Sequence, residues 1–185
     1  MPAFTNYFAY RSAAERYARS RPFFHSIVTD KIKEAIPLAF PVADALDVGC
    51  GTGQSTVALR TIADSVIGVD ISSDMLSVAL PGDNVRYLIA PAEHIPLPDA
   101  VFDLVTVSLA FHWLDRPAFF GEARRTLRNN GWLVIYNNAF RGEMAGNPAF
   151  GGWLRNILLG EIRPLFPSPK ETLLFGGYIW YLQKT

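Results

Sequence analysis

One short stretch of the chain, ALDVGCGTGQST (residues 45–56), gathers residue types that could bind a small ligand. The acidic Asp47 is followed by glycines at every second position, Gly49, Gly51 and Gly53. Glycine loses more conformational freedom on folding than any other residue, so this cluster indicates a turn that must be approached closely. A glycine turn between a strand and a helix is expected to direct its N–H groups outward, and the stretch therefore predicts a nucleotide or anion site.

The spacing of the glycines separates two kinds of nucleotide site. The dinucleotide fingerprint G-x-G-x-x-G would place its third glycine at Gln54, so that pattern fails. The order Asp47-x-Gly49-x-Gly51-x-Gly53 resembles the first motif of class I S-adenosylmethionine-dependent methyltransferases. The resemblance implies that this loop, with Cys50, cradles the methionine part of S-adenosyl-L-methionine, a zwitterion and not a pyrophosphate. A glycine-rich connection without a ligand is the alternative interpretation.

Residues after the second expected strand match the same pattern. Asp70 closes that strand, where a carboxylate can accept hydrogen bonds from both ribose hydroxyls of an adenosine; its alternative role is to cap the next helix. The resemblance also places Ile71 and Met75 at the cofactor, although a methionine on a helix is more often a core residue.

The segment APAEHIPLPDAVFDLVTVSLAFHW (residues 90–113) resembles the adenine-binding and post-fourth-strand segments of the family. The resemblance implies that Ala92 and Glu93 lie against the adenine and that Ser108 lies under the sulfonium. The alternative for Glu93 is a solvated loop charge. Arg21 is a further candidate, for the carboxylate of the cofactor or for an acidic substrate, and it could equally be a solvated arginine.

His112 is the candidate catalytic residue, as an orienting donor or general base for the methyl acceptor. Its neighbours Phe111 and Trp113 either shape a dry pocket or fill the core, in which case the histidine is structural. His25 and His94 are expected at the surface. No Ser–His–Asp pattern competes, and the single cysteine makes a zinc–thiolate site implausible, so no metal is expected.

Strands and helices must alternate to position these residues. Strands are expected over 43–48, 65–70, 85–89, 101–110 and 132–137, and helices over 20–41, 54–63, 72–80 and 116–131. The last of these helices has Asp115 as its expected cap and Asn130-Gly131 as its expected end. The alternation predicts an α/β fold, a doubly wound and mostly parallel sheet of the Rossmann-like methyltransferase type.

The region after the fifth strand is shorter than the family pattern leads us to expect. A helix is expected over 147–166, with Asn147 as cap and Pro164 at its end, followed by a last, antiparallel strand over 172–184 with a glycine bulge at Gly176-Gly177. Either the chain has lost an internal segment or a flexible segment is absent. We expect a single domain over 1–185, comprising an N-terminal helical segment (1–41), a cofactor-binding core (42–138) and a shortened C-terminal part (139–185).

Composition and charge narrow the function further. Lys+Arg and Asp+Glu balance at 17 each, which argues against nucleic acid or an anionic membrane as partner. No apolar run has the length of a membrane span, no signal-peptide pattern is present, and the expected compartment is the cytoplasm.

The resemblance covers Tyr7 to Tyr136 and is closest to the small-molecule branch that includes trans-aconitate methyltransferase. It implies O-methylation of a carboxylate or hydroxyl on a small-molecule acceptor. Two alternatives are a macromolecule-directed methyltransferase and a cofactor-binding module with weak or no catalysis.

Overall fold

A computed structural model describes residues 11–20, 23–137, 156, 159–174 and 177–185. Its centre is a seven-stranded sheet in the order β3-β2-β1-β4-β5-β7-β6. The strands are β1 (Val42–Val48), β2 (Ala63–Asp70), β3 (Val85–Ile89), β4 (Phe102–Ser108), β5 (Leu127–Asn137), β6 (Lys170–Leu174) and β7 (Gly177–Gln183). Strands β1 to β5 are parallel, and β7 is antiparallel to both β5 and β6. The predicted α/β fold, with a mostly parallel sheet and an antiparallel last strand, is confirmed.

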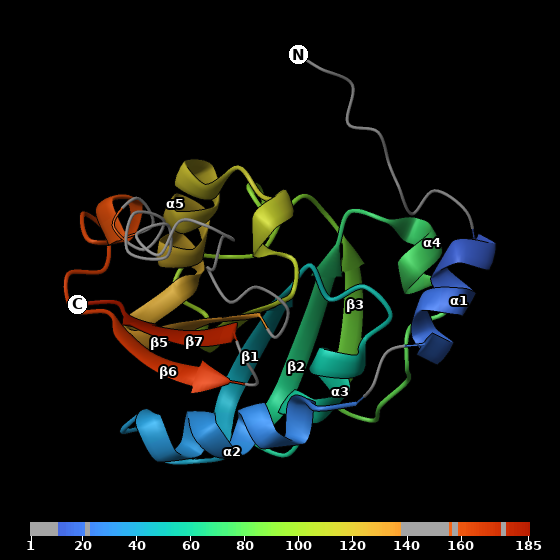
Figure 1. The fold of residues 1–185 in the computed structure, drawn as a ribbon, viewed down its shortest axis with the longest axis horizontal. Helices are drawn as coiled ribbons and strands as arrows, with labels where there is room; N and C mark the ends of the chain where they lie inside the picture. Colours follow the sequence, from blue (N-terminus) through green and yellow to red (C-terminus); the bar gives the residue numbers. More distant parts are fainter. Residues whose placement is uncertain (1–10, 21–22, 138–155, 157–158, 175–176) are drawn as a thin grey trace, which may run out of the picture.

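Helices cover both faces of this sheet. They are α1 (Arg11–Ser20), α2 (His25–Ala35), α3 (Gln54–Leu59), α4 (Ser73–Leu76), the 3-10 helix η1 (Phe111–Trp113) and α5 (Arg116–Thr126). Figure 1 shows α2 on one face and α5 on the other. The strand order reverses between β1 and β4, and in open α/β sheets this switch point, at the carboxyl ends of the strands, is where ligands bind.

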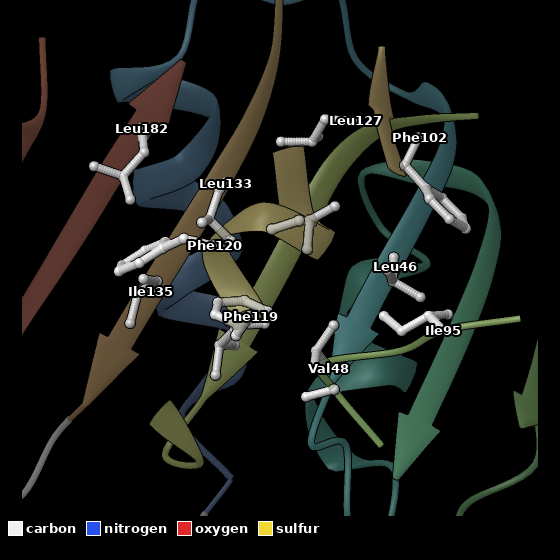
Figure 2. Packing of buried hydrophobic residues seen from close by; sticks show 14 of the residues in the cluster. Leu46, Val48, Ile95, Phe102, Phe119, Phe120, Leu127, Leu133, Ile135 and Leu182 are labelled. Atoms are coloured by element: carbon white, nitrogen blue, oxygen red, sulfur yellow. The ribbon is translucent and has the colours of Figure 1, made fainter. Parts of the chain in front are cut away.

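The core lies in two layers because the central strands are apolar on both faces. In β4, Val105 packs in the layer beneath α5 whereas its neighbour Leu104 packs in the layer beneath α2. Figure 2 shows residues of the first layer, which include Phe119 and Phe120 of α5 and Leu133 of β5. Strands covered on both sides have this continuous apolar character, as the sequence of β4 predicts.

The N-terminal helical region differs from the single helix expected over 20–41. The structure has two helices, α1 and α2, and α2 ends at Ala35. The following residue, Ile36, is extended (φ −105°, ψ 125°) because it precedes Pro37, whose ring disfavours the α conformation in the residue before it. Helices α3 and α4 are also shorter than predicted, and Ser72 caps α4 by accepting a hydrogen bond from the Met75 N–H.

Helix α5 begins as predicted and ends earlier. Asp115 caps it by accepting a hydrogen bond from the Ala118 N–H at 3.4 Å. The predicted end at Asn130-Gly131 is wrong, because β5 already starts at Leu127. Asn130 takes a left-handed conformation (φ +65°) inside β5, where the pairing register with β4 shifts. A bulge in a strand accepts such a residue as readily as a helix terminus does.

The C-terminal part contains one strand more than predicted. Instead of a single strand over 172–184 with a glycine bulge, β6 and β7 pair antiparallel, with Leu174 opposite Gly177. The two residues between these strands, and the expected cap Asn147, lie outside the described residues. Residues 159–162 are helical, and the helix ends before Pro164 as expected. Among the described residues, no helix has the length and apolar character that crossing a bilayer requires.

Candidate functional site

The glycine loop between β1 and α3 needs glycine for two reasons. Gly49, Gly51 and Gly53 all have positive φ, at +66°, +54° and +78°. A Cβ on Gly49 would stand 2.5 Å from the Cβ of Ala110 in the loop after β4. One on Gly51 would stand 3.1 Å from the Cε of Met75 in α4. The loop is therefore a left-handed turn onto which the loop after β4 and helix α4 pack directly.

Tyr87 of β3 holds the far end of this loop, and it is not among the residues predicted from the sequence. Its hydroxyl occupies the space that a Cβ on Gly53 would need, and it donates to the carbonyl oxygen of Leu80 at 2.6 Å. Its ring covers Gly68 in β2, where a Cβ would meet it at 2.7 Å. Burial raises the pKa of Tyr87, so the hydroxyl remains a donor. A glycine in a strand can mark such a close approach, so Gly68 was the available signal.

The N–H groups of the loop do not face outward, contrary to the prediction from the sequence. Those of Gly49 and Cys50 both donate to the carbonyl oxygen of Val69, at 2.8 and 3.1 Å. The Gly53 N–H donates to the Cys50 carbonyl, and the Gly51 N–H donates to Asp70. Four donors that could have held a phosphate are thus used within the protein. The loop is better suited to a ligand that brings its own donors than to an anion.

Asp70 lies at the carboxyl end of β2, and its carboxylate accepts hydrogen bonds from the backbone N–H groups around it, that of Ile71 included. Oδ2 accepts from the Gly51 N–H and Oδ1 from the Ser72 N–H, both at 2.8 Å. Burial raises the pKa of Asp70, and these hydrogen bonds oppose that shift. The side-chain cap of α4 is Ser72 and not Asp70. Because an ionised carboxylate has about four acceptor sites, the three backbone hydrogen bonds leave capacity for a ligand hydroxyl.

Asp47 is fully buried, and its carboxylate joins the glycine loop to the sheet. Ser55 and Thr56 of α3 donate to its Oδ2 at 2.6 and 2.7 Å, and Thr106 of β4 donates to its Oδ1 at 2.9 Å. Burial raises the pKa of Asp47 from 3.8 to about 6, although the three hydroxyls counteract part of the shift. The visible action of Asp47 is therefore to fix the start of α3 against β1 and β4, and its contact with a cofactor stays a prediction.

Four further residues predicted at the cofactor stand around the ends of β2 and β3. Ile71 is 65% exposed, whereas Met75 and Ala92 are buried. Glu93 is not a free loop charge, because its Oε1 accepts a hydrogen bond from the Asp115 N–H at 2.9 Å. The loop after β3 is thereby tied to the start of α5.

The residues after β4 divide between core and surface. Ser108 is buried at the end of the strand. Phe111 packs on Phe120 with ring centroids 5.6 Å apart, whereas Trp113 is 53% exposed and lies beside His112 at 4.8 Å. The His112 side chain is exposed, yet the protein around it desolvates the ring enough to lower its pKa. His112 is therefore neutral near pH 7 and can accept a proton.

His25 is buried, contrary to the expectation that it lies at the surface, and His94 is exposed as expected. The His25 ring stacks on Phe24, and its Nδ1 lies 3.1 Å from the hydroxyl of Tyr136 near the end of β5. Burial raises the pKa of Tyr136, so this contact involves a neutral phenol. The pair joins α2 to the sheet at the edge that carries the candidate site.

The last candidates concern the N-terminal segment and metals. Arg21 lies outside the described residues. Helix α1 packs against α4, and Gln54 at the start of α3 donates to the Ala18 carbonyl at 3.2 Å, so α1 lies beside the glycine loop. Within the described ranges, no group of three or more histidine, cysteine or acidic residues could hold a metal ion.

Comparisons with known proteins agree with this geometry. Residues 46–135 match a family model described as a methyltransferase domain. A protein of Dictyostelium discoideum named as a methyltransferase is 37% identical over 130 residues, which are 68% of this chain and 47% of that protein. A malonyl-[acyl-carrier protein] O-methyltransferase of Hahella chejuensis is 37% identical over 119 residues, 59% of this chain and 43% of that enzyme. The chain spans about half the length of these relatives.

Solved structures show the same fold. The crystal structure of a protein of Methanococcus maripaludis, described as an S-adenosyl-L-methionine-dependent methyltransferase, superposes with a TM-score of 0.74. It is 19% identical, and the alignment covers 100% of this chain and 97% of that one. In sequence and fold, residues 46–135 are thus a class I S-adenosylmethionine-dependent methyltransferase domain. The cofactor that this family and fold imply is S-adenosyl-L-methionine.

Proposed function

We propose that the chain binds S-adenosyl-L-methionine at the carboxyl ends of β1, β2 and β4 and transfers its methyl group to an oxygen of a small molecule. The observation that carries the proposal is the bond from the Gly51 N–H to Asp70 Oδ2 at 2.8 Å. This bond joins the glycine loop to an acidic acceptor at the next strand end. The N–H donors of the loop are already bonded within the protein, whereas the carboxylate of Asp70 remains available as an acceptor. Such a site suits a nucleoside with a ribose diol and an ammonium group better than it suits a pyrophosphate.

Most of the predicted binding residues take one part of the cofactor in this proposal. Asp70 accepts the ribose hydroxyls, and the loop of Gly49, Cys50, Gly51 and Gly53 surrounds the methionine part. The adenine lies among the side chains of Ile71, Met75, Ala92 and Glu93. Asp47 acts from behind the loop by holding the start of α3. Arg21 remains a candidate for the cofactor carboxylate or for an acidic acceptor.

Titration calorimetry tests the cofactor assignment. Wild type should bind S-adenosylhomocysteine and should not bind NAD. S-Adenosylhomocysteine lacking the ribose 2′-hydroxyl should bind about tenfold or more weakly, because a hydrogen bond to a charged acceptor is lost. In Asp70→Ala this difference between the two ligands should disappear, even though the variant also loosens the glycine loop. A difference that persists in Asp70→Ala would show that another group binds the ribose.

The acceptor is proposed to be a carboxylate or a hydroxyl on a small molecule. The Hahella chejuensis relative is named as an O-methyltransferase, and the net charge of zero gives nucleic acid no general attraction. The branch that includes trans-aconitate methyltransferase is our finer proposal. In the reaction, the acceptor oxygen forms a bond to the methyl carbon while the carbon–sulfur bond breaks, leaving a neutral thioether. The protein chiefly aligns the two reactants and excludes water.

Variants of His112 distinguish a carboxylate acceptor from a hydroxyl acceptor. A carboxylate needs no base, so His112→Gln should retain most activity on an acid. A hydroxyl loses its proton on methylation, and here His112→Ala should lower kcat by about 10²-fold, the usual contribution of a general base. Melting temperatures should stay at the wild-type value because the side chain is exposed. A fall in melting temperature that accounts for the lost activity would assign His112 a structural role. A panel of acids and alcohols assayed with labelled S-adenosylmethionine provides the measurement, and no turnover on any of them would favour a cofactor-binding module.

A further inference from the structure

Arg125, in the last turn of α5, makes an unusually complete set of hydrogen bonds to the loop that joins β3 to β4. Nη1 donates to the Leu97 carbonyl at 2.8 Å and to Asp99 Oδ1 at 2.6 Å. Nη2 donates to the Ile95 carbonyl at 2.9 Å. The remaining N–H groups of the guanidinium donate to the carboxylate of Glu122, at 2.7 and 2.8 Å. All five N–H groups of the side chain therefore have acceptors.

Glu122 lies one helical turn before Arg125 in α5 and also bonds to the loop between β3 and β4. It is buried, and its Oε1 accepts the Ile95 N–H at 2.6 Å in addition to the bond from Arg125. The hydrogen bonds from Arg125 lower the pKa of Glu122, so the pair is charged across the working pH range. Ile95 is thus held through both its N–H and its carbonyl group, and its side chain packs in the core beneath α5 (Figure 2).

The opposite end of α5 holds the other half of the same loop. The Asp115 N–H, at the N-cap of the helix, donates to Glu93 Oε1 at 2.9 Å. Within residues 91–99 the described backbone hydrogen bonds are local, from His94 to Pro91 and from Leu97 to Ile95. The loop conformation consequently depends on α5, which contacts it at the N-cap and in the last turn.

We propose that Glu122 and Arg125 are positioning residues that set the affinity and the base specificity of the cofactor site by fixing the loop of residues 91–99. This inference rests on the proposed function, because Ala92 and Glu93 of that loop are the residues assigned to the adenine. Both positioning residues act through the loop, and neither is assigned a contact with the cofactor. They affect the affinity for the cofactor and do not take part in catalysis at saturating cofactor.

Arg125→Lys is the test variant and Arg124→Lys its matched control. Lysine keeps the charge but replaces a planar fork of five donors by a point charge that cannot reach all the acceptors. Arg124 occupies the next position of the same helix, and it donates to the Leu165 and Thr185 carbonyls, away from the loop. Both substitutions remove hydrogen bonds to backbone carbonyls, but only Arg125→Lys removes bonds to the loop of residues 91–99.

Calorimetry with S-adenosylhomocysteine and its 6-oxopurine analogue, S-inosylhomocysteine, should separate the two variants. In Arg125→Lys the Kd for S-adenosylhomocysteine should rise about tenfold or more, and the preference over the inosine analogue should shrink. Its kcat at saturating S-adenosylmethionine should remain near wild type, while KM for the cofactor rises. Arg124→Lys should keep the wild-type Kd and preference. Hydrogen exchange of the amides of residues 92–99 should become faster in Arg125→Lys alone.

Asp99→Ala keeps the test decisive if Arg125→Lys folds poorly, because Asp99 is exposed and its loss removes one anchor without burying a charge. Here the Kd should rise a fewfold in the same direction. Equal weakening of Arg124→Lys and Arg125→Lys, or a Kd within twofold of wild type in Arg125→Lys, would overturn the inference and leave the cofactor assignment intact. Failure of wild type to bind S-adenosylhomocysteine would overturn both.

Discussion

Replacing Asp47 by asparagine removes a charge from a carboxyl group that no solvent reaches. The carboxylate accepts hydroxyl hydrogen bonds from Ser55, Thr56 and Thr106, and these do not fully offset the cost of burial. Its pKa in the folded protein is therefore raised from 3.8 to about 6. Asparagine has nearly the same shape, and the hydroxyls can rotate to donate or accept, so the local packing is conserved.

The raised pKa gives the effect a definite sign and pH window. A group whose folded pKa lies above its unfolded pKa contributes stability below the unfolded value and loses it as pH rises through the folded value. The stability that Asp47 contributes is therefore complete below pH 3.8 and lost by about pH 6 and above. A shift of about two pKa units at about 1.4 kcal/mol each amounts to roughly 3 kcal/mol at most.

Denaturant unfolding of wild type and Asp47→Asn from pH 4 to pH 7.5 measures this contribution. The free energy of unfolding of the variant, relative to wild type, should increase with pH by about 2–3 kcal/mol across the range. Packing differences between the proteins add a constant offset that leaves this slope unchanged. Parallel curves for the two proteins would refute the argument, and would mean that Asp47 titrates alike in the folded and unfolded states.

Two further predictions concern the loop and the buried histidine. Gly49→Ala should destabilise the protein by about 2 kcal/mol or more, because its φ of +66° is unfavourable for alanine and its Cβ would meet Ala110. Adding Ala110→Gly should recover the steric part only, and a denaturation double-mutant cycle with no coupling would contradict this contact. Tyr136→Phe should cost about 1–3 kcal/mol in denaturant unfolding, since it removes the hydroxyl beside the buried His25. An unchanged midpoint would show that this contact contributes nothing to stability.

The local patterns of the sequence determine the elements that carry the site. Apolar runs separated by helical patterns predict five parallel strands, and the strand over 85–89 has the predicted bounds. The caps Ser72 and Asp115 follow from side chains that bond to the backbone within a few residues. The spacing of Gly49, Gly51 and Gly53 predicts the turn, because a left-handed conformation is a property of the residue itself.

Contacts between distant residues were decided only by the tertiary structure. His25 and Tyr136 are 111 positions apart, and nothing near either residue in the sequence indicates that they meet. Asn130-Gly131 is locally a good helix end, yet pairing of β5 with β4 extends the strand through it. The direction of the loop N–H groups depends likewise on Val69 and Asp70 of the neighbouring strand.

The physical reason is the range of the forces involved. Conformational preferences and capping act within one or two turns of chain, so the order of residues is enough to predict them. Strand register, burial and the partners of a carboxylate or guanidinium depend on which segments pack together in three dimensions. The sequence alone thus predicts a glycine loop with an acidic residue after the next strand. Only the packing of the sheet determines that Asp47 bonds to the start of α3 behind the glycine loop and that Asp70 accepts a hydrogen bond from that loop. The same holds for Arg125, which bonds to the neighbouring loop between β3 and β4.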